Sequence, residues 1–184
     1  MLDEEEKEQP LFSRRIGSSR YIIDANCIRE GQADPDLEQL QVWKDNGVIR
    51  LDISDVAATE AARGSAERTA KTMNRIRVGT LFSRSHEMFP VVESILFRRG
   101  ADTQNKVNDV LIVLNAKVNG YTLITNDGDI FKKAKQLNDE IGLRVLRPKQ
   151  AVAEIRPKIQ SHDELLKRTC AREGITPPDW LGKD

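Results

Sequence analysis

Four acidic residues stand where their carboxylates could do chemistry. Asp24 and Asp127 each follow a short apolar run, while Glu60 and Asp109 lie in predicted helices on the side that carries apolar residues. A buried carboxylate without a partner is costly, so such placement needs a reason. Several carboxylates brought together raise one another's pKa, and a hard divalent cation that prefers oxygen ligands relieves the repulsion. The pattern predicts a Mg²⁺ or Mn²⁺ site able to activate water for phosphodiester hydrolysis.

Each acid also has a simpler interpretation. Asp24 or Asp127 could only cap the next helix, since aspartate does so readily. Glu60 or Asp109 could form a buried salt bridge with a lysine or arginine. In the predicted helix 105–119 we expect Asp109 to point inward, and the exposed polar positions to be Asn108, Asn115 and Asn119.

The elements that must position these acids alternate between short apolar runs and helical periodicities. The expected strands are 21–23, 48–51, 121–125 and 143–146. The expected helices are 36–43, 54–60 with Ser54 as its cap, 89–99, 105–119, 127–141, a short helix from Pro148, a break near Pro157, and a last helix over 163–173. Such alternation predicts an α/β fold, a three-layer α/β/α sandwich with a central parallel sheet. In these folds ligands bind beyond the carboxyl ends of the strands, where Asp24 and Asp127 fall.

Composition narrows the function classes. The 184 residues are 39% apolar and 32% charged with zero net charge, which is typical of a soluble globular chain. No apolar run could cross a bilayer and no secretory signal is evident, so we expect a cytoplasmic protein without membrane contact. Two cysteines and two histidines leave little material for a disulfide framework, a zinc site or a histidine-based triad. We expect Cys27 to be an inert buried thiol.

We divide the chain into an N-terminal arm (1–19), a catalytic domain (20–147) and a C-terminal helical extension (148–184). Residues 63–84 carry six bases against one acid. This segment follows Glu60 directly, so it could hold an RNA backbone. Its alternative interpretation is an ordinary solvated helix face. The RNA-binding candidates in it are Arg63, Arg68, Lys71 and Arg75.

The segments that carry the acids resemble those of PIN domains. Tyr21-Ile-Ile-Asp24-Ala-Asn26 is similar to the family's opening strand, Glu60 matches its second acid, and Asn108-Asp109 opening an apolar helix matches its third. Leu123-Ile-Thr125-Asn-Asp127-Gly-Asp129 resembles the segment that carries the fourth acid and often a fifth. The resemblance covers roughly residues 20–146.

This resemblance implies a PIN-like fold and a metal-dependent endoribonuclease. It implies that Asp24, Glu60, Asp109 and Asp127 are catalytic and bind Mg²⁺ or Mn²⁺, with Asp129 as an auxiliary ligand. Asn26 and Thr125 would orient these carboxylates by hydrogen bonds. Many family members are ribonuclease toxins paired with an antitoxin protein, and PIN domains commonly form homodimers. RNA, an antitoxin and a second copy are therefore the implied partners.

Two other functions remain open on the sequence. A phosphatase of the haloacid-dehalogenase kind also places aspartate at a strand end and binds Mg²⁺, but its second acid would stand where this chain has Asn26. A non-catalytic nucleic-acid-binding module could keep the fold without the chemistry. The complete set of four acids argues against the module, because a scaffold alone has no need to bury them.

Overall fold

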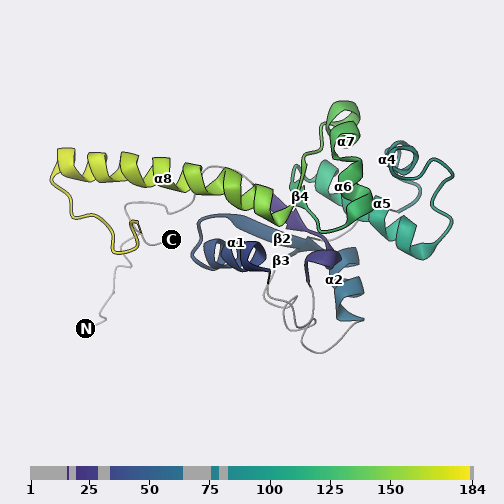
Figure 1. The fold of residues 1–184 in the computed structure, drawn as a ribbon, viewed down its shortest axis with the longest axis horizontal. Helices are drawn as coiled ribbons and strands as arrows, with labels where there is room; N and C mark the ends of the chain where they lie inside the picture. Colours follow the sequence, from purple (N-terminus) through teal and green to yellow (C-terminus); the bar gives the residue numbers. More distant parts are fainter. Residues whose placement is uncertain (1–15, 17–19, 29–33, 64–75, 79–82, 183–184) are drawn as a thin grey trace, which may run out of the picture.

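The computed structural model describes residue 16 and residues 20–28, 34–63, 76–78 and 83–182 (Figure 1). Five strands form one parallel sheet in the order β3-β2-β1-β4-β5. Their bounds are β1 Arg20–Ile23, β2 Arg50–Ser54, β3 Ile76–Val78, β4 Thr122–Ile124 and β5 Val145–Leu146. The predicted α/β class with a central parallel sheet is confirmed. All five strands point the same way, so their carboxyl ends share one edge.

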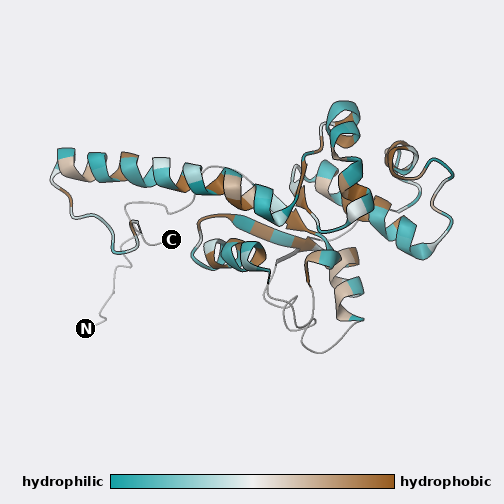
Figure 2. Ribbon diagram, viewed as in Figure 1, coloured by the Kyte–Doolittle hydropathy of each residue, from teal (hydrophilic) through white to brown (hydrophobic). Residues whose placement is uncertain are grey.

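Helices flank the sheet. On one side α1 (Pro35–Asp45) and α8 (Pro148–Glu173) contact each other and the sheet. On the other side α5 (Gln104–Val118) contacts β4, with α2 (Asp55–Ala62) and α4 (Phe89–Leu96) packed against it. The 3₁₀ turn η1 (Ala25–Cys27) follows β1, and α6 (Gly128–Lys132) and α7 (Ala134–Ile141) follow β4. Hydrophobic residues run along the strands and along the part of α8 nearest the sheet (Figure 2).

Local signals explain the helix starts. Ser54 Oγ accepts a hydrogen bond from the main-chain N–H of Ala57 (3.1 Å), so the predicted cap of α2 is confirmed. Asp34 caps α1 in the same way ahead of Pro35, which suits a first helical position. Gly120, with φ of +68°, follows the C-terminal end of α5 in a conformation that glycine adopts without strain.

The predicted break at Pro157 is wrong, because α8 runs without interruption through it. Proline lacks an N–H and crowds the preceding turn, which normally ends a helix. Here Pro157 faces solvent, while Ile155 and Ile159 on either side are buried in the core. Packing of that apolar face holds both halves of α8 in one line.

The C-terminal segment returns to α8, where Asp163 accepts a hydrogen bond from the N–H of Gly182 (3.0 Å).

Strand β3 was not expected, and several other boundaries differ from prediction, three of them for a local reason. Strand β2 begins at Arg50 and not at position 48, because the N–H groups of Val48 and Ile49 donate to the Trp43 carbonyl and close α1. The helix expected over 127–141 is divided at Lys133, whose ψ of 2° leaves the helical region. Helix α4 ends at Leu96, because Phe97 is extended.

The domain boundaries stay a prediction. Ile16, within the expected N-terminal arm, is buried and donates to the Val48 carbonyl (3.1 Å). The rest of that arm, apart from Ile16, lies outside the described residues. No helix among the described residues is both long and apolar enough to cross a membrane.

Candidate active site

Asp24 lies at the carboxyl edge of the central strand. Its main chain is extended and its N–H donates to the Ile124 carbonyl of β4 (3.0 Å), so the residue is fixed by the sheet. It is 1% exposed. The side chain makes no cap to the following turn, so the capping interpretation fails for this residue. Helix capping therefore does not account for the burial of its carboxylate.

Two neutral side chains hold that carboxylate. Thr125 Oγ1 donates to Asp24 Oδ2 at 2.8 Å, and Asn26 Nδ2 donates to the same oxygen at 3.2 Å. Burial raises the pKa of Asp24, and these two hydrogen bonds act against that shift. Asn26 and Thr125 thus contact the carboxylate in the orienting positions that the resemblance implies.

Asp127 uses its two oxygens differently. Oδ1 caps α6 by accepting from the N–H groups of Asp129 (2.7 Å) and Ile130 (2.9 Å). Oδ2 accepts from Asn26 Nδ2 at 3.3 Å, and the Asp127 N–H donates to Thr125 Oγ1 at 2.8 Å. The capping interpretation is right for this residue, but it accounts for only one oxygen. The other oxygen is tied through Asn26 to Asp24.

Glu60 and Asp109 reach the same region from two helices. Asn108 Nδ2 donates to Glu60 Oε1 at 2.5 Å and so links α5 to α2. Asp109 is half-buried, and its pKa is raised to about 7. Burial is the largest cause, followed by the charges of Asp24, Asp127, Glu60 and Asp129 in that order. Asp24, Asp127 and Glu60 therefore all lie within electrostatic range of Asp109.

The expected exposure of the α5 asparagines is wrong. Asn108 is 7% exposed and Asn115 is fully buried, because α5 is covered on almost every side by β4, α2 and α4. Asn108 is also held by Gln104 Nε2, which donates to its side-chain oxygen at 2.8 Å. The sequence signal was present, since Asn108 lies four residues before the buried Ile112.

A buried salt bridge does not explain Asp24 or Asp109. Within the described part of the chain, neither of them nor Asp127 forms an ion pair with a lysine or arginine. The oxygen donors and their mutual repulsion fit a hard divalent cation. In the present side-chain positions, no three acidic, histidine or cysteine side chains among the described residues lie close enough to share one ion. Side chains must therefore move for three carboxylates to share an ion.

The remaining predicted site residues are either exposed at the surface or outside the described residues. Asp129 is exposed and pairs with Lys132 (2.8 Å), which lowers the Asp129 pKa. Arg63 is exposed at the C-terminal end of α2. The other RNA-binding candidates, Arg68, Lys71 and Arg75, fall outside the described residues.

Cys27 is the buried thiol that the sequence predicted. Burial raises its pKa to about 12, and its Sγ donates to the Ile124 carbonyl (3.4 Å). A thiol with so high a pKa carries almost no thiolate at neutral pH, so it is not a nucleophile.

Asp52 is another buried aspartate, and nothing in the sequence predicted its burial. Asp52 of β2 is fully buried, and its Oδ2 accepts from Arg50 Nε and Tyr121 Oη, both at 2.6 Å. Burial and the bond to Asp52 raise the pKa of Tyr121 to about 12. Because side chains alternate along a strand, Asp52 and Asp24 lie on the same face of the sheet. Only the sheet register, which the sequence does not give, reveals this network.

Comparison with known proteins gives similarity at the level of solved structures. No protein-family model and no curated protein matches the chain. The chain is similar to VapBC2 from Rickettsia felis bound to a DNA fragment from their promoter, at 17% identity and a TM-score of 0.47, over 69% of this chain and 97% of that one. It is also similar to FitAB bound to an IR36 DNA fragment, at 18% identity and a TM-score of 0.45, over 70% of this chain and 94% of that one. At this identity the similarity concerns the path of the backbone alone, so function has to be inferred from the protein's own side chains.

Proposed function

We propose that this protein is a Mg²⁺- or Mn²⁺-dependent ribonuclease. The observation that carries the proposal is that Asn26 donates to both Asp24 and Asp127, while the charges of Asp24, Asp127 and Glu60 all act on Asp109. A protein that used buried carboxylates only for its fold would pair them with cations of its own. Asp24, Asp109 and Asp127 have no cationic partner among the described residues.

In this proposal Asp24, Glu60, Asp109 and Asp127 hold the metal ion, and Asp129 assists from the rim. The ion would supply Lewis-acid stabilisation of the phosphodiester and lower the pKa of a water molecule. Thr125 and Asn26 keep Asp24 in place, and Asn108 keeps Glu60 in place. No side chain of the protein becomes covalently attached to the substrate.

The phosphatase alternative has less support. Its second acid would stand at position 26, where Asn26 donates hydrogen bonds to both Asp24 and Asp127. A carboxamide cannot transfer a proton as a general acid. Trapping of a phosphoryl group on Asp24 would nevertheless overturn the nuclease proposal.

The test is cleavage of mixed cellular RNA by the purified protein with Mn²⁺ and with EDTA. We expect cleavage with Mn²⁺ only, and its loss in Asp24→Asn. The matched control is Asp139→Asn, because Asp139 is exposed on α7 and, within the described part of the chain, pairs only with Lys135. Equal cleavage by the wild type and Asp24→Asn would refute the proposal. Absence of Mn²⁺ binding by calorimetry would favour the non-catalytic module.

The partners implied by the resemblance stay predictions. Growth arrest on expression of the wild type, but not of Asp24→Asn, tests the toxin role that an antitoxin partner presupposes. Light scattering of the purified protein tests the homodimer.

A further inference from the structure

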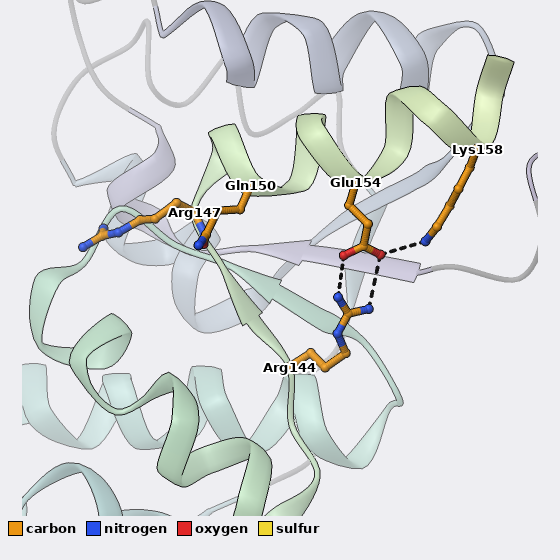
Figure 3. A network of polar contacts seen from close by, with 5 residues as sticks. All are labelled: Arg144, Arg147, Gln150, Glu154 and Lys158. Carbon is orange, nitrogen blue, oxygen red and sulfur yellow. Dashed lines mark hydrogen bonds and ion pairs between the residues drawn. The ribbon is translucent and has the colours of Figure 1, made fainter.

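Two arginines near β5 point in opposite directions. Arg144 lies just before the strand and Arg147 just after it, and Figure 3 shows the Arg147 side chain extending away from Glu154. Arg144 forms a two-pronged ion pair with Glu154 of α8, which also accepts from Lys158 Nζ at 2.7 Å. The charge of Arg144 is thus matched by a carboxylate. That pair joins α8 to the end of the sheet and needs no ligand.

Arg147 has different partners. Its Nη1 donates to the Thr125 carbonyl at 3.3 Å, and its guanidinium lies 4.4 Å from the centroid of the Phe131 ring. Neither partner carries a negative charge. Among the described residues no carboxylate pairs with Arg147. The half-buried guanidinium therefore keeps its positive charge and most of its donors available.

The position of Arg147 is set by the same residues that build the carboxylate cluster. Thr125 accepts from Arg147 through its main-chain oxygen and donates to Asp24 through its hydroxyl. Phe131, which lies under the guanidinium, belongs to α6, and Asp127 caps that helix. Arg147 thus contacts the two segments that position Asp24 and Asp127, and it forms no ion pair with an acid among the described residues.

A cluster of carboxylates repels the phosphate backbone of RNA, so the substrate needs a cation nearby. Guanidinium presents planar donors that suit two oxygens of one phosphate. The Phe131 ring fixes the plane of those donors and lowers the entropy lost on binding. We propose, on the basis of the proposed ribonuclease function, that Arg147 binds a backbone phosphate of the RNA strand next to the phosphate that is cleaved.

The test measures binding separately from cleavage. A short fluorescent single-stranded RNA is titrated by anisotropy against the full-length Asp24→Asn protein, with Arg147→Gln or Arg144→Gln added. One phosphate contact on a single strand is worth a change of about 0.7 in the slope of log K against log salt. We expect Arg147→Gln to weaken binding about tenfold and to reduce that slope by this amount. We expect Arg144→Gln to leave affinity unchanged and to lower only thermal stability.

Two further arms sharpen the result. Arg147→Lys keeps the charge but loses the planar fork, so we expect an intermediate affinity. A strand with abasic sites keeps every phosphate, so we expect the effect of Arg147→Gln to persist on it. Loss of the effect on the abasic strand would mean that Arg147 stacks on a base, and equal weakening by Arg144→Gln would mean a diffuse charge effect. Either result would overturn the proposal.

The inference and the function it rests on can fail separately. If the wild type cleaves RNA with Mn²⁺ but Arg147→Gln binds and cleaves as the wild type does, Arg147 has no part in binding and the nuclease proposal stands. If the wild type does not cleave but RNA affinity still depends on Arg147, the phosphate contact stands and the nuclease proposal fails.

Discussion

Asp24 and Asp52 are both buried on one face of the same sheet, yet their surroundings are opposite. Asp52 has Arg50 and Tyr121 as donors, so its charge is matched within the protein. Asp24 receives only neutral donors, and the charged groups near it are other acids. Asp52 is a structural ion pair. Asp24 has no cationic partner among the described residues, and a buried carboxylate that lies near other acids favours an external cation.

The largest expected effect on stability comes from breaking the network of Asp52, Arg50 and Tyr121. Removing one partner of a buried pair strands the other, so we expect Asp52→Asn to lower the free energy of unfolding by about 3 kcal/mol. This value is at the lower end of the range for breaking a buried ion pair, because the Arg50 side chain is partly exposed and water can solvate it. Urea unfolding at pH 7 measures it. If Asp52→Asn left the urea midpoint unchanged, Asp52 would not be the stabilising ion-pair partner that distinguishes it from Asp24.

The second expected effect is a pH dependence of the free energy of unfolding that arises from Asp109. Its pKa is raised from 3.8 to about 7, so the folded state holds the proton more tightly than the unfolded state. Stability of the protein in EDTA should therefore fall as pH rises from about 4 to 7 and stay level above. We expect Asp109→Asn to reduce this slope, to which Asp24 with its own raised pKa also contributes, and to add about 2 kcal/mol at pH 8. This gain is half of the free energy that the full pKa shift implies, because Asp109 is only half-buried.

The measurement for Asp109 is urea unfolding in EDTA at several pH values, with Asp139→Asn as the exposed control. A similar slope in wild type and Asp109→Asn would contradict the prediction. Mn²⁺ should stabilise the wild type more at pH 8 than at pH 6, because deprotonated carboxylates bind the ion.

A smaller gain in stability is expected when the Asp24 carboxylate is replaced. Asparagine keeps an oxygen that can accept from both Thr125 and Asn26 and removes a buried charge. We expect Asp24→Asn to stabilise the protein in EDTA by about 1 kcal/mol at pH 8, while cleavage is lost. Differential scanning fluorimetry and the RNA assay measure the two effects. A loss of stability like that of Asp52→Asn would remove the contrast between the two aspartates.

The smallest effect concerns the half-exposed pair of Arg144 and Glu154, which serves as a reference for both buried acids. The hydrogen bond from Arg144 lowers the pKa of Glu154 to about 2. The pair's contribution is therefore complete above pH 4.5 and is lost as pH falls toward 2. We expect Glu154→Gln to cost at most about 1 kcal/mol at pH 7, because solvent screens the pair, and less at pH 3. A constant difference between pH 7 and pH 3 would show that the charge of Glu154 is not involved.

Much of the site could be predicted because its signals are local. Asp24 and Asn26 lie two residues apart at the end of an apolar run, and Thr125 and Asp127 repeat that arrangement on another strand. A parallel sheet brings the carboxyl ends of neighbouring strands together, so these four residues could be placed near one another from pattern alone. The buried face of α5 was harder to predict, because helical periodicity shows which residues share a stripe but not which stripes other elements cover.

What the sequence by itself determined is the set of acids, their order and the strand edge that carries two of them, because short stretches of chain fix strand ends and helix caps. Tertiary packing alone decided the rest. It brought the charges of Asp24 and Glu60 within range of Asp109, buried Asn108 between two helices, and carried α8 straight through Pro157. It also placed Arg147 against Thr125 and Phe131. These contacts join residues far apart in the chain, and their free energy comes from burial and charge that exist only once the layers have packed.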